Sequence, residues 1–370
     1  MIKRWTTILL CLILVVSFSA CGNKKQANDS ANVEKESSVP TPTLEPTTTP
    51  EEKKLSVSVS FDAMKELVAA VGKDKVEIVA VIPAGTETHD FEPKAQDLVN
   101  LSAADIFVYN GLGMEGWAEE AIAAADNTDL IVIEASNGAV VIENETSDDH
   151  DDDHDDGHDD DHDDGHDDDH DDGHDDDHDD GHNDDHDDGH DDDHDDGHSH
   201  GKYDPHLWLS LKGAQTMITN IRDGLIQADP SNKDYYEQNH NEFAAQLEAL
   251  YQDYSEKFQS VEKKNFVTGH AAFGYLCRDF GLEQNSIRNM FAEGEPSAKQ
   301  LAELVEYCRE HNVTTIFSEE MVSAEVSQTL ANEVGAKVEI IYTMENPQDG
   351  MTYLERMESN LSKIYASLTN

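Results

Sequence analysis

The chain has 370 residues, with 80 acidic and 25 basic side chains and a formal net charge of -55. It therefore lacks the basic surface that binding to nucleic acid or to an anionic membrane surface requires, which excludes both as partners. The charge is unevenly distributed, because residues 148–200 contain 31 Asp, 14 His and no Lys or Arg. The rest of the chain has a net charge of -24 and is long enough for about two domains.

Residues 1–21 are predicted to be a lipoprotein signal peptide and are excluded from the fold. Two basic residues precede the apolar stretch Ile8–Val16, which is short for a membrane span. Small residues then stand directly before Cys21, as in a bacterial lipobox, so we expect Cys21 to carry the lipid. The alternative is an ordinary secretory peptide cleaved near Ala20. On either interpretation the protein is exported, and the first interpretation places it outside the cytoplasm, anchored to the cell membrane.

Residues 22–54 are polar and rich in Pro and Thr, which predicts a disordered tether. From Leu55 onward, short strands alternate with helices, and this alternation predicts α/β lobes with parallel sheets flanked by helices. Before the Asp/His-rich segment, the predicted elements are strand Leu55–Val59, helix Phe61–Val71, strand Val76–Ile82, helix Lys94–Leu101, strand Ile106–Tyr109, helix Trp117–Ala125 and strand Leu130–Ile133.

After that segment, a helix over Gly213–Gln227 precedes a long, polar helix that is suited to joining two lobes. The remaining predicted elements are strand Phe266–Thr268, helix Ala272–Phe280, helix Ser297–Glu310, strand Val313–Phe317, helix Ser323–Val334, strand Val338–Ile341 and helix Met351–Ser367. The predicted division is an N-terminal lobe at 55–230 containing the insertion 148–200, a rigid interlobe helix at 231–260, and a C-terminal lobe at 261–370. Cys277 and Cys308 lie in the second lobe, and the sequence leaves their pairing open.

The insertion repeats the unit His-Asp-Asp-Asp-His-Asp-Asp-Gly, so that His recurs every four residues from His150 to His198. Regular Gly and Asp–Asp repulsion oppose a stable helix, and we expect disorder in the absence of metal. Imidazole and carboxylate together bind borderline divalent metals, which predicts weak binding of several ions. The alternative is a solvated loop with no metal role. The predicted auxiliary metal ligands are His150, His154, His158, His162, His166, His170, His174, His178, His182, His186, His190, His194, His198 and His200.

Three of the five other histidines lie in loops where a site is expected. His89 follows a predicted strand, His270 lies at the carboxyl end of another, and His206 comes six residues after the insertion. In open α/β sheets, ligands bind outside the carboxyl ends of the strands. Any one of the three could be a structural residue, but together they point to a binding site. His240 and His311 are expected to be surface residues.

The motifs around these histidines resemble those of the zinc-binding lipoproteins of bacterial ABC metal importers, the cluster A-I solute-binding proteins. The specific motifs are Gly-x-x-x-His-x-Phe-Glu-Pro at His89 and Asp-Pro-His-Leu-Trp-Leu at His206. The resemblance covers about Leu55 to Ser367, and the insertion resembles the His-rich loop of zinc-specific members. It implies a high-affinity protein that captures Zn²⁺ between two lobes and delivers it to an ABC permease driven by an ATPase, as a monomer and not an enzyme.

The resemblance also implies three imidazole ligands at His89, His206 and His270. It implies a carboxylate ligand after the last strand of the second lobe, which we assign to Glu345, with Glu319 and Glu320 as alternatives. Manganese carriers in the family have a carboxylate in place of His270, so this set favours zinc. Because the ligands must lose their protons, we expect affinity to fall below a pH of about 6.5.

Other functions remain open at this stage. The protein could bind manganese or another divalent metal, or act as a surface zinc buffer or adhesin without a transporter. A zinc hydrolase is a further alternative, since three protein ligands and a water make a catalytic site. The sequence contains no HExxH motif, and a fourth protein ligand would close the site.

Overall fold

The computed structural model describes residues 53–144, 201–289, 296–320, 324–348 and 350–369. The predicted signal peptide with Cys21, nearly all of the predicted tether and every histidine of the insertion lie outside these residues. The described residues belong to one compact unit, Glu52–Asn370. Among them, no helix is long and apolar enough to cross a membrane.

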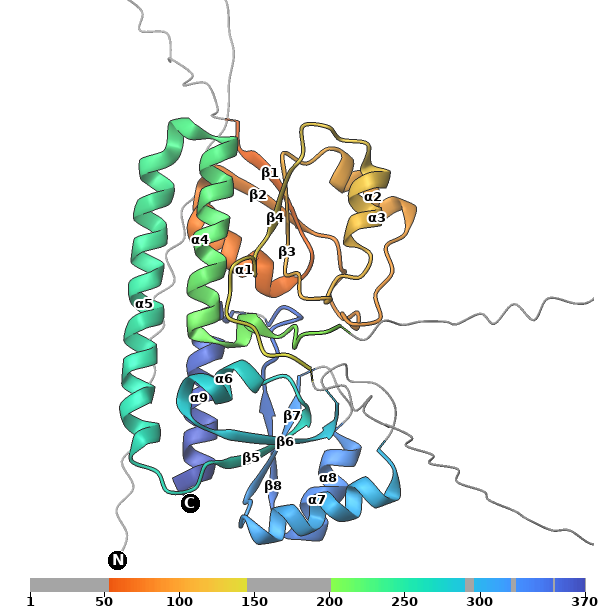
Figure 1. Cartoon of the computed structure of the whole chain (residues 1–370), viewed down its shortest axis with the longest axis vertical. Helices are drawn as coiled ribbons and strands as arrows, with labels where there is room; N and C mark the ends of the chain where they lie inside the picture. Colours follow the sequence, from red (N-terminus) through yellow and green to blue (C-terminus); the bar gives the residue numbers. More distant parts are fainter. Residues whose placement is uncertain (1–52, 145–200, 290–295, 321–323, 349, 370) are drawn as a thin grey trace, which may run out of the picture. The chain divides into compact units, whose positions relative to one another are not determined.

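In the part of the chain that the structure describes, eight strands form two parallel sheets of four, and helices flank both sheets (Figure 1). The strand order is β2-β1-β3-β4 in the first sheet and β6-β5-β7-β8 in the second. The strands are β1 (Leu55–Val59), β2 (Val76–Ala80), β3 (Ile106–Tyr109), β4 (Ile131–Glu134), β5 (Asn265–His270), β6 (Glu283–Arg288), β7 (Thr315–Glu319) and β8 (Lys337–Ile341). The predicted fold class, two α/β lobes with parallel sheets and a long joining helix, is confirmed.

The helices begin and end within a few residues of the predicted positions. The α-helices are α1 (Asp62–Gly72), α2 (Ala95–Ser102), α3 (Ala118–Ala125), α4 (Leu211–Ala228), α5 (Lys233–Gln259), α6 (Gly274–Phe280), α7 (Ala298–Glu310), α8 (Glu325–Val334) and α9 (Tyr353–Thr369). Short 3₁₀ helices are η1 (Lys73–Lys75), η2 (Leu207–Leu209) and η3 (Pro230–Asn232).

Strand β6 has no counterpart in the sequence prediction. Its sequence, Glu-Gln-Asn-Ser-Ile-Arg, contains a single apolar residue, Ile287, which is the one buried position of the strand. The strand forms because it pairs in parallel with β5 at the edge of the second sheet. An edge strand that is mostly polar lacks the apolar pattern by which strands are recognised in a sequence.

The long helix α5 runs beside both lobes and packs against helices from each, including α1 and α4 of the first and α6 and α9 of the second (Figure 1). Its 27 residues are mostly polar, but Tyr236, Leu247, Tyr254 and Phe258 are buried. One continuous apolar cluster joins these side chains to both sheets, while a smaller cluster lies between the second sheet and helices α7 and α8. The shared core therefore resists large relative movement of the lobes.

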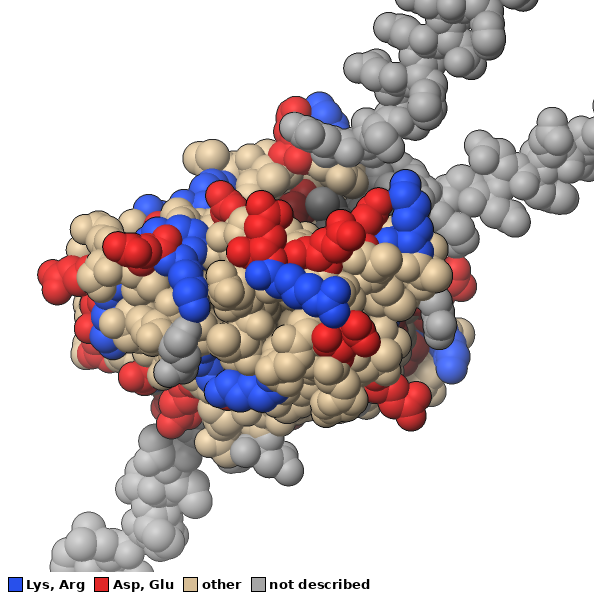
Figure 2. All heavy atoms as spheres, turned by 90° about the horizontal axis from the view of Figure 1, so that it is seen from below, with Lys and Arg blue, Asp and Glu red and all other residues tan. Residues whose placement is uncertain are grey.

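The surface is mixed in charge, and the buried cysteines are free. On the face seen from below, Lys and Arg side chains are interspersed with Asp and Glu (Figure 2). That face thus offers no continuous basic surface to a polyanion. Cys277 and Cys308 are both buried and unpaired to each other, and burial raises the pKa of the Cys308 thiol to about 11.

Candidate metal centre

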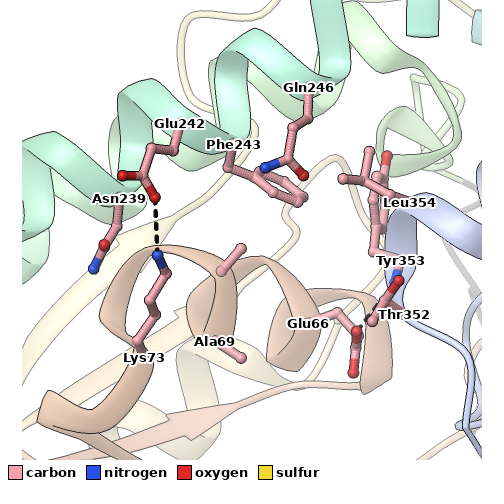
Figure 3. A pocket seen from close by; sticks show the side chains of 11 residues that line it. Glu66, Ala69, Lys73, Asn239, Glu242, Phe243, Gln246, Thr352, Tyr353 and Leu354 are labelled. Carbon is pink, nitrogen blue, oxygen red and sulfur yellow. Dashed lines mark hydrogen bonds and ion pairs between the residues drawn. The ribbon is translucent and has the colours of Figure 1, made fainter.

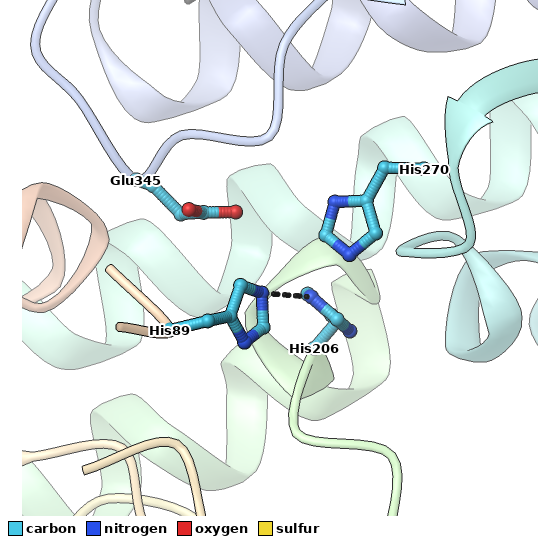
Figure 4. Close-up of side chains that lie close together, drawn as sticks. All are labelled: His89, His206, His270 and Glu345. Carbon is cyan, nitrogen blue, oxygen red and sulfur yellow. Dashed lines mark hydrogen bonds between the residues drawn. The ribbon is translucent and has the colours of Figure 1, made fainter. Parts of the chain in front are cut away.

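Four side chains from separate segments of the chain converge between the two sheets (Figure 4). They are His89, His206, His270 and Glu345, and one ligand atom of each lies within 4.8 Å of those of the others. His89 follows β2, His206 follows β4, His270 ends β5, and Glu345 follows β8. His89, His270 and Glu345 thus stand at or beyond the carboxyl ends of parallel strands, as the topology of open α/β sheets predicts for a binding site, while His206 directly precedes η2.

The spacing fits a tetrahedral ion. The Nε2 atoms of His89 and His206 are 3.3 Å apart, and the His206 and His270 rings have centroids 4.8 Å apart. A metal about 2.0 Å from each of four ligands would separate neighbouring ligand atoms by about 3.3 Å. The His89–His206 pair already has this separation, and the other ligand atoms need to move by at most about 1.5 Å to reach it.

A carboxylate orients His206. The Nδ1–H of His206 donates to Oδ1 of Asp204 at 2.8 Å, and the backbone N–H of His206 donates to the same oxygen at 2.9 Å. Both side chains are almost fully buried, with 0% and 4% of their surface exposed. This contact fixes the tautomer and leaves Nε2 to face the other ligands, as in many zinc sites. The sequence contained the Asp-Pro-His motif, but the role of Asp204 was not predicted.

The backbone of His270 is held on both sides. Its N–H donates to Oε1 of Glu319 at 2.9 Å, and its carbonyl accepts a hydrogen bond from Nε2 of Gln284 at 2.8 Å. Gln284 lies on β6, the strand that the sequence prediction missed, and no signal in the sequence marked it. The edge strand therefore helps to place a ligand.

The His89 loop contacts the second lobe. The N–H of Gly85 donates to Oδ1 of Asn346 at 2.6 Å, and Gly85 has a φ of 83°, which a residue with a Cβ rarely adopts. Burial, followed by the neighbouring His206 and His270, holds the pKa of His89 well below its usual range. The imidazole is therefore neutral, and able to bind a metal, at physiological pH.

The pKa of Glu345 shifts in the opposite direction. Burial, followed by the charges of Glu87 and Glu320, raises the pKa of this carboxyl to about 8. The side chain is only 9% exposed. In the metal-free protein Glu345 is therefore mainly protonated at pH 7. This moves the expected onset of weaker binding from a pH of about 6.5 to a pH near 8.

The two alternative carboxylates have other contacts. Glu319 accepts the N–H of His270, and Glu320 accepts the N–H groups of Thr343 and Met344 at 3.0 and 3.2 Å. Neither belongs to the four-residue cluster found among the described residues. Their positions support the loops that carry ligands, so Glu345 is the carboxylate that the structure brings to the three imidazoles.

The remaining two histidines lie elsewhere. His240 was expected at the surface, but it is only 9% exposed and its Nε2 lies 3.1 Å from Oγ1 of Thr219, so that expectation was wrong. It is buried because α5 packs against α4. His311 lies at the end of α7, partly exposed, with its ring against Tyr307.

The two ends of the insertion are brought together near His206. The N–H of Asn144 donates to the carbonyl of Lys202 at 2.8 Å, and Glu143 pairs with Tyr203 in an isolated antiparallel bridge. Tyr203 is three residues before His206. The chain therefore leaves and re-enters the described structure close to the cluster.

The donor set is three imidazoles and one carboxylate, which suits tetrahedral zinc and other borderline divalent ions better than calcium or magnesium. The fourth protein side chain occupies the position that a hydrolytic site would leave to water. The chemistry that the geometry supports is reversible metal binding.

Known proteins are similar to this chain in sequence and fold. The family described as "Zinc-uptake complex component A periplasmic" matches residues 57–367. A relative from Treponema pallidum (strain Nichols) is 42% identical over 313 residues, covering 84% of this chain and 86% of the relative. The "High-affinity zinc uptake system protein ZnuA" of Bacillus subtilis (strain 168) is 34% identical, covering 100% of this chain and 99% of that protein. The zinc-bound ZnuA-like domain of Streptococcus pneumoniae AdcA superimposes with a TM-score of 0.63 at 26% identity, covering 86% of this chain and 100% of that domain.

Zinc binding at pH 7 should release about one proton per ion, mainly from Glu345, because its pKa of about 8 leaves it protonated in the metal-free protein. His89 should contribute none, because its pKa is depressed. Calorimetry in buffers of different ionisation enthalpy measures this number. Proton release should disappear above a pH of about 9, and affinity should rise with pH up to about 8. A Glu345→Gln variant that releases as many protons as the wild type would contradict the assignment.

Proposed function

Because the chain belongs to the family of zinc-uptake complex component A, whose profile matches residues 57–367, we propose that it captures Zn²⁺ outside the cytoplasm for an ABC importer. The observation that carries this proposal is the convergence of His89, His206, His270 and Glu345 from four loops. The family is one of transport proteins, so the chain acts by binding and release, without catalysis. The partners are the permease and the ATPase of the importer.

Capture proceeds by joining two halves of one site. His89 and His206 come from the first lobe, while His270 and Glu345 come from the second, so the ion bridges both lobes. The shared core and helix α5 limit the movement to a small closure. Zinc then replaces the proton on Glu345 and gains four protein ligands. Release to the permease requires the two halves to separate.

The imidazole-rich set favours zinc over manganese. Three nitrogen ligands suit a borderline ion, whereas manganese prefers oxygen ligands. The hydrolase alternative is disfavoured, because Glu345 occupies the fourth position. The four-residue cluster is suited to binding and delivering a single ion, so its geometry does not support the alternative of a surface zinc buffer or adhesin.

We further propose the membrane anchor and the arrangement along the chain. Cys21 would carry the lipid, and residues 22–54 would let a monomeric binding unit move near the membrane. The division into a lobe at 55–230, a joining helix at 231–260 and a lobe at 261–370 follows the two sheets and α5.

The histidines of the insertion would act as an auxiliary collector. The described residues on either side of the insertion, Asn144 and Lys202, are hydrogen-bonded, and Lys202 is four residues before His206 in the sequence. A tract of 14 imidazoles among 31 carboxylates would hold several ions weakly and raise their concentration near the site.

Metal titration of the mature protein in competition with a chelator should report one tightly bound zinc ion and several weak ones. In a His270→Ala variant, the affinity of the tight site for zinc should fall by at least about 100-fold, because one of its three imidazoles is removed. A His240→Ala variant is the matched control, since His240 is also buried but lies outside the cluster, and it should keep the tight ion. Equal tight binding by the His270→Ala variant would contradict the site.

Replacing residues 148–200 with a Gly/Ser linker of equal length should remove the weak ions and leave the tight one. The linker preserves the chain connection between Asn144 and Gly201 while removing all 14 histidines of the insertion. Zinc-limited growth of a strain that depends on this importer should then slow, and loading in stopped-flow measurements should be slower. Unchanged loading and growth at limiting zinc would contradict the collector role.

A further inference from the structure

The loop that carries Glu345 has a constrained backbone. Met344, directly before Glu345, has a φ of 62°, a left-handed conformation that a residue with a long side chain rarely adopts. Glu320 stabilises it by accepting the N–H groups of Thr343 and Met344. This fixes the amino-terminal side of the loop to the end of β7, within the second lobe.

The other side of the loop is held by a buried ion pair that joins the lobes. Nη1 of Arg356 donates to the carbonyl of Asn346 at 3.0 Å, and Nη2 donates to Oδ2 of Asp62 at 2.8 Å. The N–H of Asp62 faces the carbonyl of Glu345 at 3.4 Å. Asp62 begins α1 of the first lobe, whereas Arg356 lies on α9 of the second. The first lobe therefore contacts the carbonyl of Glu345 through Asp62, and the second lobe contacts the carbonyl of Asn346 through Arg356.

Stability alone is a weak explanation for this pair. The side chains of Arg356 and Asp62 are only 1% and 6% exposed, so both charges have lost their hydration. Replacing a buried ion pair with apolar side chains of similar volume is often neutral or stabilising. Because this pair joins the two lobes at the backbone of the Glu345 loop, it can also fix the position of that loop.

The neighbouring contacts between α1 and α9 are also polar. One turn further along α1, Oε2 of Glu66 accepts the N–H of Tyr353 at 3.1 Å. Beside this contact, a groove of about 340 Å³ opens between α1, α5 and the start of α9, with Phe243 at its wall (Figure 3). Polar contacts therefore act together with the shared apolar core in setting the position of α9 relative to α1.

We propose that Asp62 and Arg356 are positioning residues that hold the Glu345 loop in the zinc site when the two lobes are together. The inference rests on the proposed zinc-binding function and adds the device that couples the lobes to the fourth ligand. Separation of the lobes breaks the Asp62–Arg356 contact, which releases the Glu345 loop and weakens zinc binding.

A double-mutant cycle on zinc affinity tests this coupling. Arg356→Met and Glu345→Gln are made singly and together, and each affinity is measured by chelator competition. The Arg356→Met change should weaken binding by about 10- to 100-fold, as loss of an outer partner of a ligand does. In the Glu345→Gln background the same change should have less than about a threefold effect, because the residue acts through Glu345. A general structural role would instead multiply the two losses.

A second variant distinguishes a loss of positioning from a loss of folding. Arg356→Met alone leaves the Asp62 carboxylate buried without its partner, whereas Asp62→Leu with Arg356→Met removes both charges. This double replacement should unfold near the wild-type temperature and still weaken zinc binding. Lys363→Met is the matched control on α9, since Nζ of Lys363 donates to the carbonyl of Ile340 on β8, and its affinity should be unchanged.

The outcomes separate the two claims. A wild-type protein without a tight zinc ion would overturn the proposed function. If the wild type binds tightly and Glu345→Gln weakens binding, but the Arg356 variants bind like the wild type or the losses multiply, the positioning role alone is overturned.

Discussion

A four-coordinate zinc ion requires ligand atoms about 3.3 Å apart, and the four side chains that we propose as ligands come from segments separated by up to 256 positions in the sequence. The fold meets this requirement by setting the carboxyl ends of two parallel sheets opposite each other. Helix α5 and the shared apolar core then hold the sheets at nearly the required distance. The site therefore depends on the juxtaposition of the lobes, and each ligand loop is braced where it meets that junction.

Burial away from water shifts the pKa values of two side chains in the site, His89 and Glu345. The same burial that lowers the pKa of His89 raises the pKa of Glu345, because a charge on either side chain is disfavoured away from water. Both groups are therefore mainly neutral in the metal-free protein at pH 7. The neutral form of Glu345 avoids repulsion from the nearby carboxylates of Glu87 and Glu320. In the proposed site, zinc would supply the charge that stabilises the Glu345 carboxylate and would thereby couple binding to proton release.

The sequence predicted the strands and helices with strong apolar patterns, such as β1, β3 and α1, because burial imposes those patterns. It missed β6, since a polar edge strand is defined by its pairing with β5. It placed the three histidines in loops at strand ends, and the structure brings them together with Glu345. Glu319 ends β7, Glu320 follows it, and Glu345 lies beyond β8, so position after a strand could not separate them, and only the resemblance favoured Glu345. Only the tertiary structure distinguishes them, because Glu319 and Glu320 accept backbone N–H groups of other segments.

The central claim is that one zinc ion is bound by three imidazoles and one carboxylate contributed by both lobes. X-ray absorption spectroscopy of the protein loaded with one equivalent of zinc measures this ligand set directly. The account predicts four nitrogen and oxygen neighbours at about 2.0–2.1 Å, with the outer-shell scattering of three imidazole rings. That imidazole scattering should fall to two rings in a His270→Ala variant. A spectrum with sulfur ligands, or with fewer than three imidazoles in the wild type, would contradict the account.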